Sequence, residues 1–203
     1  MRALLLFLLL AGPALGGAWP RDEGETFLSF SLASTGDPFG SVYFERGLAG
    51  RFGLSGKAGV SAGFREVEAG VDLSLGSTAP VKLTLGASLS GAPGVETGAA
   101  FGRIAAGRTL PFGPDGWAEL SAGVSLGLSR QISGTSQATL GMGIGGGRQV
   151  ILQLHATHEE GRHGLTAAPL FVMPLGQRLK LVGGVEWSPG GGLSPSLSTW
   201  VEF

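Results

Sequence analysis

Apolar and polar residues alternate along most of the chain after residue 25. The stretches VEAGVDLSL (67–75) and AELSAGVSLGL (118–128) are the clearest cases. A period of two is the strand period, because successive side chains of a strand point to opposite faces of a sheet. The pattern predicts strands near residues 25–34, 41–48, 51–61, 65–75, 81–90, 96–108, 116–128, 135–145, 148–158, 164–173, 178–187 and 195–203. A break in the alternation at 101–104 suggests a bulge in the sixth strand.

Short clusters of glycine, proline, aspartate and serine separate these segments, such as TGDPFG, SGAPG, PFGPDG and SPGGG. These residue types accept turn conformations, and none of the clusters is long. Residues 17–203 are therefore expected to form a single all-β domain of about 12 antiparallel strands, within a range of roughly 10–14, with short loops on both sides.

The less apolar face of the strands distinguishes a membrane barrel from a soluble sandwich. In a sandwich this face would meet water and carry mainly Lys, Glu, Asn and Thr. Here it carries mostly Gly and Ser with isolated charges, whereas the other face is a nearly unbroken series of Leu, Val and Ala. We therefore expect a transmembrane antiparallel up-and-down β-barrel, with a soluble β protein as the alternative.

Composition agrees with this expectation and removes several functional classes. Charged residues make up 14% of the chain, hydrophobic residues 43%, and 38 of the 203 residues are glycine. The net charge of −1 offers no basic excess for nucleic acid. The absence of cysteine excludes disulfides, thiolate zinc sites and cysteine nucleophiles.

The first residues, MRALLLFLLLAGPALGGA, have the layout of a secretory signal peptide. Arg2 precedes a short apolar run, and small residues follow it. The run is too short for a membrane anchor, which needs about 20 apolar residues. We expect residues 1–16 to be cleaved, with the boundary between 16 and 18.

The final residues, LSTWVEF, form an alternating strand that ends on an aromatic residue, with Leu197, Thr199, Val201 and Phe203 on one face. This resembles the C-terminal signature of bacterial outer-membrane β-barrel proteins. The resemblance implies a location in the outer membrane of a Gram-negative bacterium. It also implies contact with membrane lipid and recognition by the barrel-assembly machinery through Phe203, Val201 and Leu197. An even number of strands then places both termini in the periplasm, and we expect a monomer.

Charged residues on the less apolar parity are predicted to face the barrel lumen. They are Lys57, Glu66, Glu68, Asp72, Lys82, Glu119, His155, Lys180 and Glu186. In a channel they would bias the passing solute, and in a closed barrel they would form a salt-bridged plug. The small residues around them favour a narrow passive channel for small hydrophilic solutes. The alternative is a closed structural or envelope-maintenance barrel. Trp117 and Trp200 share this parity without an evident reason.

Catalytic and metal-binding chemistry has little support. Outer-membrane lipid hydrolases pair a serine with a nearby histidine, but no serine lies within several residues of any histidine here. A lipid-acting enzyme is therefore a minor alternative. His158, Glu159 and His163 could share one external turn, whereas His155 points to the other face of its strand, and a polar hairpin explains these residues as well. We expect no cofactor and no metal.

Overall fold

The computed structural model describes residues 18–19, 21–35, 37–75, 80–111 and 115–203. The described residues form twelve strands. These are β1 (Thr26–Thr35), β2 (Asp37–Gly47), β3 (Phe52–Ser61), β4 (Phe64–Leu75), β5 (Val81–Gly91), β6 (Thr97–Leu110), β7 (Gly116–Gly127), β8 (Ile132–Gly145), β9 (Arg148–Glu159), β10 (Arg162–Pro174), β11 (Leu179–Ser188) and β12 (Gly192–Glu202). Within these ranges, no helix is long and apolar enough to cross a membrane.

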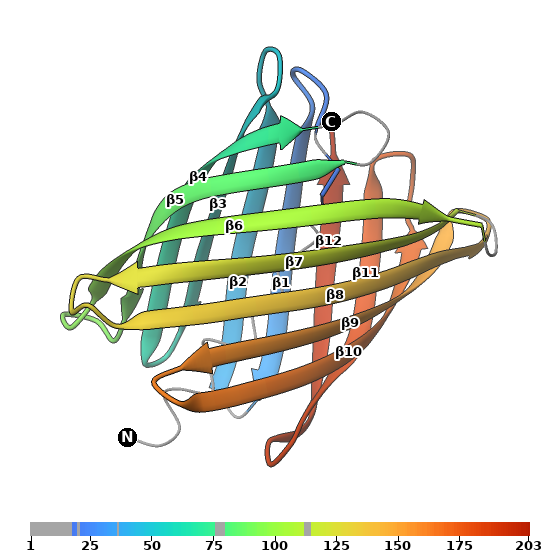
Figure 1. Ribbon diagram of the computed structural model, residues 1–203. Helices are drawn as coiled ribbons and strands as arrows, with labels where there is room; N and C mark the ends of the chain where they lie inside the picture. The colour runs from blue at the N-terminus through green and yellow to red at the C-terminus, as the bar shows by residue number, and fades with distance from the viewer. Residues whose placement is uncertain (1–17, 20, 36, 76–79, 112–114) are drawn as a thin grey trace.

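Each strand pairs with its sequence neighbours, and β1 pairs with β12, so the sheet closes into a barrel. All pairings are antiparallel, from Phe27 opposite Glu202 to Ala33 opposite Ser196 at the closing seam. In Figure 1 the front strands β6–β10 cross the back strands β1, β2, β11 and β12 at a steep angle, as the tilted strands of a closed barrel do. The predicted twelve-stranded antiparallel barrel is therefore confirmed.

The hairpins follow from local sequence. The two-residue turns Glu160–Gly161 and Gly146–Gly147 both have positive φ at their two positions, which matches the twist of the flanking strands. Glycine reaches this conformation without strain. The other connections in the described ranges are also only a few residues long. Where the structure describes the connections, the ends of the barrel are therefore formed by short turns.

The two parities of the strands now have distinct surroundings. Large apolar residues on the outer face stay exposed, with 66% of Leu120, 60% of Leu85 and 55% of Val124 accessible. Their sequence neighbours, such as Glu119 and Thr84, are buried inside the barrel. An apolar exterior around a polar interior is the arrangement of a barrel that spans lipid.

Two details of the strands differ from the sequence expectation. The sixth strand contains no bulge, because β6 pairs in regular register with both neighbours, and Phe101 and Arg103 both point inward. The register shift lies instead between Gly143 and Gly145 of β8. Strands β2, β8 and β12 begin a few residues earlier than their sequence patterns indicated.

Closure of the barrel can be tested by a disulfide across the β1–β12 seam. The hydroxyl oxygens of Ser31 and Ser198 lie 2.8 Å apart, so cysteines at these positions are placed to bond. We expect Ser31→Cys with Ser198→Cys to form a disulfide on oxidation, detected by altered gel mobility after denaturation. Leu32→Cys with Ser198→Cys is the matched control, because Leu32 points outward. Crosslinking in both pairs, or in neither, would argue against this seam.

Candidate functional site

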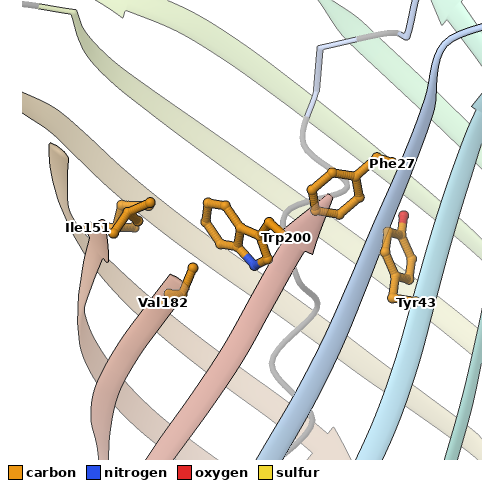
Figure 2. Close-up of a cluster of buried hydrophobic side chains, with 6 residues drawn as sticks. Phe27, Tyr43, Ile151, Val182 and Trp200 are labelled. Carbon is orange, nitrogen blue, oxygen red and sulfur yellow. The ribbon is translucent and has the colours of Figure 1, made fainter. Parts of the chain in front are cut away.

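Inside the barrel, a cluster of apolar side chains lies near the end at which β1 begins and β12 ends, called the terminal end below. This inner cluster consists of Phe27, Tyr43, Ile151, Val172, Val182 and Trp200. Figure 2 shows five of its side chains directed toward one another from β1, β2, β9, β11 and β12. The ring centroids of Trp200 and Phe27 are 6.2 Å apart in an edge-to-face arrangement. The inward position of Trp200, which the sequence left unexplained, therefore packs the lumen near this end.

Glu45 is the centre of a buried charge network beside the inner cluster. Its Oε1 atom accepts hydrogen bonds from the Tyr43 hydroxyl at 2.6 Å and from Lys82 Nζ at 2.5 Å. Its Oε2 atom accepts a hydrogen bond from Arg21 Nε at 3.2 Å. Glu45 is 2% exposed and Lys82 is 5% exposed. A buried carboxylate held by two cations and a hydroxyl satisfies the condition under which charges are tolerated away from water.

A second set of charged residues lies farther along the lumen. Lys57 Nζ is 2.6 Å from Glu66 Oε1, and Arg103 donates a hydrogen bond to Glu68 at 3.0 Å. Asp72, on the same strand as the two glutamates, accepts hydrogen bonds from the Thr84 and Ser55 hydroxyls instead of from a base. The middle of the lumen therefore carries both signs of charge on one part of its wall.

A polar cavity of about 650 Å³ extends from these charges toward the opposite end of the barrel. It begins at Tyr43 and reaches Arg162 and Ser188, which lie beside the hairpin turns of that end. Its wall includes Lys57, Glu68, Arg103, Ser121, Thr135 and His155. This volume falls within the range of small-molecule sites, and the lining offers hydrogen-bond donors and acceptors along its length.

Several inward polar atoms lack a partner within the protein. Across the described residues these include Gln153 Nε2, His155 Nδ1 and Glu186 Oε1. A buried polar group without a hydrogen bond costs roughly 1–3 kcal/mol. These three groups of β9 and β11 therefore remain unsatisfied within the protein itself.

The structure places all nine charged residues named from the sequence on the inward face of their strands. Lys57, Glu66, Glu68 and His155 line the polar cavity, and Asp72, Lys82 and Glu119 are buried deeper. Lys180 pairs with Glu202 at the terminal end, with Nζ and Oε2 at 3.2 Å. Glu186 lies on β11 opposite Ser194 of β12. These residues belong to separate groups along the lumen and do not form one ring.

Sequence reasoning missed the residues that complete these groups. Arg21, Glu45 and Arg103 each pair with an inward partner, and Tyr43 donates to Glu45. The sequence did contain a signal, which was a single charged residue on the inner parity of a short stretch. Glu45 is that residue in VYFERG, and Arg103 is that residue in FGRIA. The break at 101–104 hid the parity of Arg103.

The rim of the opposite end holds two of the three histidines and an ion pair. His158 and His163 face each other across β9 and β10, with their Nδ1 atoms 3.2 Å apart, whereas His155 points into the lumen. Arg65 pairs with Glu96 across neighbouring hairpins. Hydrogen bonds from the backbone of Glu96 itself and of Gly94, together with Arg65, hold the pKa of Glu96 below its usual value. Within the described ranges, no three His, Asp or Glu residues are placed to hold a metal ion.

Several solved outer-membrane porins and channels have a similar backbone. The KdgM porin has a TM-score of 0.68 at 10% identity, with 88% of this chain and 99% of that chain covered. The COG4313 outer membrane channel from Pseudomonas putida F1 has a TM-score of 0.66 at 11% identity, covering 95% and 100%. The fold is that of an outer-membrane β-barrel porin. The NanC porin agrees, with a TM-score of 0.61 at 8% identity, covering 88% of this chain and 98% of that chain.

At 8–11% identity these porins share only the fold with this chain, and the solutes that they carry do not indicate the solute of this one. No protein-family model matches the sequence, and no curated protein matches it. The porin fold is thus shared, whereas the residues that line this lumen are specific to this chain.

Proposed function

We propose that the protein is a narrow passive channel for small hydrophilic solutes in the outer membrane of a Gram-negative bacterium. The observation that carries this proposal is the polar cavity, which occupies the lumen from Tyr43 to the opposite end and is lined by hydroxyls and both signs of charge. Twelve strands give a barrel between the side-chain-filled eight-stranded forms and the wide 16-stranded porins. The porin fold supports the same reading.

The terminal end faces the periplasm in this proposal, since exported barrels with an even number of strands keep both termini on that side. The polar cavity then opens to the outside, and the inner cluster makes the pathway narrowest near the periplasm. A KdgM porin has been solved in complex with disordered oligogalacturonate, so a barrel of this fold can bind a hydrophilic chain. In this protein the basic residues of the mid-lumen pair with carboxylates, which favours small solutes of mixed or no charge.

Insertion of the purified protein into a planar lipid bilayer tests the proposal. Discrete conductance steps would support a channel, and small steps are expected because the inner cluster narrows one end. Absence of steps across a range of pH and salt would instead favour a second candidate, a closed structural barrel. The observation behind this candidate is the inner cluster, which fills part of the lumen. Turnover of phospholipid or lipid A by the same preparation would support the alternative that the protein is a lipid-acting enzyme.

Assembly through the last strand is a further part of the proposal. Phe203 extends the β1–β12 pairing, since its backbone N–H and C=O both bond to Thr26 at 3.0 and 2.7 Å. Its side chain is 55% exposed, so deleting it removes less than the roughly 1.5–3 kcal/mol of a fully buried aromatic.

Deletion of Phe203 is therefore expected to act on biogenesis more than on the finished barrel. Unfolded protein should accumulate before insertion, measured by fractionation and by heat-modifiable gel mobility. Phe203→Tyr, which keeps an aromatic ring, should restore insertion. Equal membrane levels of the wild type and the deletion would contradict a role for Phe203, Val201 and Leu197 as an assembly signal.

A further inference from the structure

Two residues that precede β1 in the chain, Ala18 and Trp19, lie inside the barrel. Ala18 is fully buried, and its backbone N–H donates a 2.8 Å hydrogen bond to Oε2 of Glu119 on β7. Glu119 is itself only 6% exposed. A buried carboxylate of β7 thus accepts a hydrogen bond from a residue 101 positions earlier in the chain.

Trp19 packs against the same wall. Its ring meets the ring of Trp117 edge-to-face, with centroids 5.4 Å apart. Gly107 of β6, directly opposite Glu119 in the β6–β7 register, leaves room for this packing. A side chain at Gly107 would place its Cβ 2.8 Å from the Trp19 ring and 3.0 Å from Ala18 Cβ. The inward positions of Trp117 and Gly107 are therefore explained by the N-terminal residues that they contact.

Arg21 contacts the other side of the lumen. Its guanidinium carbon lies 4.6 Å from the ring centroid of Phe27 on β1, a cation–π distance. Its nitrogens also reach Glu45 on β2 at 3.2 Å and Glu202 on β12 at 3.5 Å. Arg21 thus binds three strands around the closing seam of the barrel.

The two contact regions face each other across the barrel. In the closed ring of twelve strands, β7 is six places from β1 in either direction, and β6 is six places from β12. The strap, defined as Ala18, Trp19 and Arg21, therefore touches opposite walls of the lumen at the terminal end. The buried side chains of the inner cluster come from β1, β2 and β9–β12, and Trp117 of β7 packs against them. Trp19 of the strap packs on the same Trp117, so the strap and the cluster meet at β7.

We infer that the strap forms part of the narrowest section of the solute pathway. This inference rests on the proposed channel function. The strands alone enclose a wider passage at the terminal end, and the strap reduces it through Trp19 and its anchors at Glu119 and Glu45. Trp19 and Arg21 are then residues that set the size limit for solutes.

Releasing the strap should therefore enlarge the conductance. The test compares single-channel conductance of the exported, processed wild type with that of a Trp19→Ala, Arg21→Ala double variant in planar bilayers. Glu45 keeps Lys82 and Tyr43 in this variant, so the barrel is expected to stay folded, which heat-modifiable gel mobility checks. We expect a several-fold larger conductance and passage of larger uncharged sugars into liposomes.

Two further variants test whether a change in conductance comes from the strap or from a general disturbance of the barrel. Gly107→Val changes the barrel wall and leaves the strap residues unchanged. Its side chain would occupy the space of Trp19 and Ala18, so it should displace the strap and also raise conductance. Asp22→Asn changes an exposed residue of the same segment and should leave conductance at the wild-type value.

The outcomes distinguish the strap from the channel itself. A larger conductance in the double variant supports the strap, including the case in which the wild type conducts nothing. Equal, measurable conductance in the wild type and the double variant overturns the strap and leaves the channel standing. Absence of conductance in every folded variant overturns both.

Discussion

Replacing Glu45 with alanine should lower the free energy of unfolding by about 3–5 kcal/mol, the cost of leaving a buried charge without its partner. The variant leaves Lys82 without its partner. Lys82 Nζ lies 2.5 Å from the Glu45 carboxylate in the wild type, and both residues are almost fully buried. Arg21 and the Tyr43 hydroxyl lose the same acceptor. Denaturant unfolding of the refolded barrel in lipid vesicles, followed by tryptophan fluorescence, measures the change.

Glu68→Ala provides the matched control, since it also removes an inward glutamate from an ion pair. The side chains of Glu68 and Arg103 are 24% and 37% exposed, so water can replace the lost contact. A change within about 1 kcal/mol is expected, as for other exposed ion pairs. Similar losses in the two variants would show that the Glu45 site is as wet as the rest of the lumen.

Arginine at Leu85 should also destabilise the barrel strongly, by about 2–4 kcal/mol, because this residue lies midway along β5 on the outer face. The cost is that of a charge in the hydrocarbon layer. Ser121→Arg is the control, since Ser121 lines the polar cavity and a charge there can remain hydrated. The same unfolding measurement applies. Equal costs at both positions would mean that the outer face meets water, as in a soluble sandwich.

The twelve strands could be predicted because one physical pattern is repeated in each of them. Where the outer residues are Leu or Val and the inner ones Ser, Thr or a charge, as in β4, β5 and β7, the parity of every residue could be read correctly. The prediction failed where both faces carry similar residues. In FGRIA of β6, Phe101 and Arg103 both point inward, and an aromatic on the inner face imitates a bulge in the pattern.

The interior could be predicted only as a set of inward residues, without their partners. The pairs Lys82–Glu45 and Arg103–Glu68 join residues 37 and 35 positions apart, and strand alternation contains no information about which inward side chains meet. The glycines gave a misleading impression of free space. Gly86 and Gly141 are covered by the inward rings of Phe101 and Trp117 on neighbouring strands, so part of the room is already filled.

The contribution of the N-terminal residues could not be predicted from periodicity at all. Ala18, Trp19 and Arg21 precede the first strand and show no alternation. Their contacts with Glu119, Trp117 and Glu45 depend on the closure of the barrel, which brings β7 and β2 around the same space. Only the unexplained inward tryptophan at position 117 indicated that something packs there.

Solutes of the proposed channel pass through the polar cavity of this lumen. The most direct test is the single-channel current of a Ser125→Cys variant before and after reaction with a bulky thiol reagent, in a chain that has no native cysteine. Ser125 lines the cavity, whereas its neighbour Leu126 is 53% exposed on the outer face and serves as the control site. We expect a stepwise fall in current for Ser125→Cys and an unchanged current for Leu126→Cys. An unchanged current at Ser125→Cys after complete labelling would contradict it.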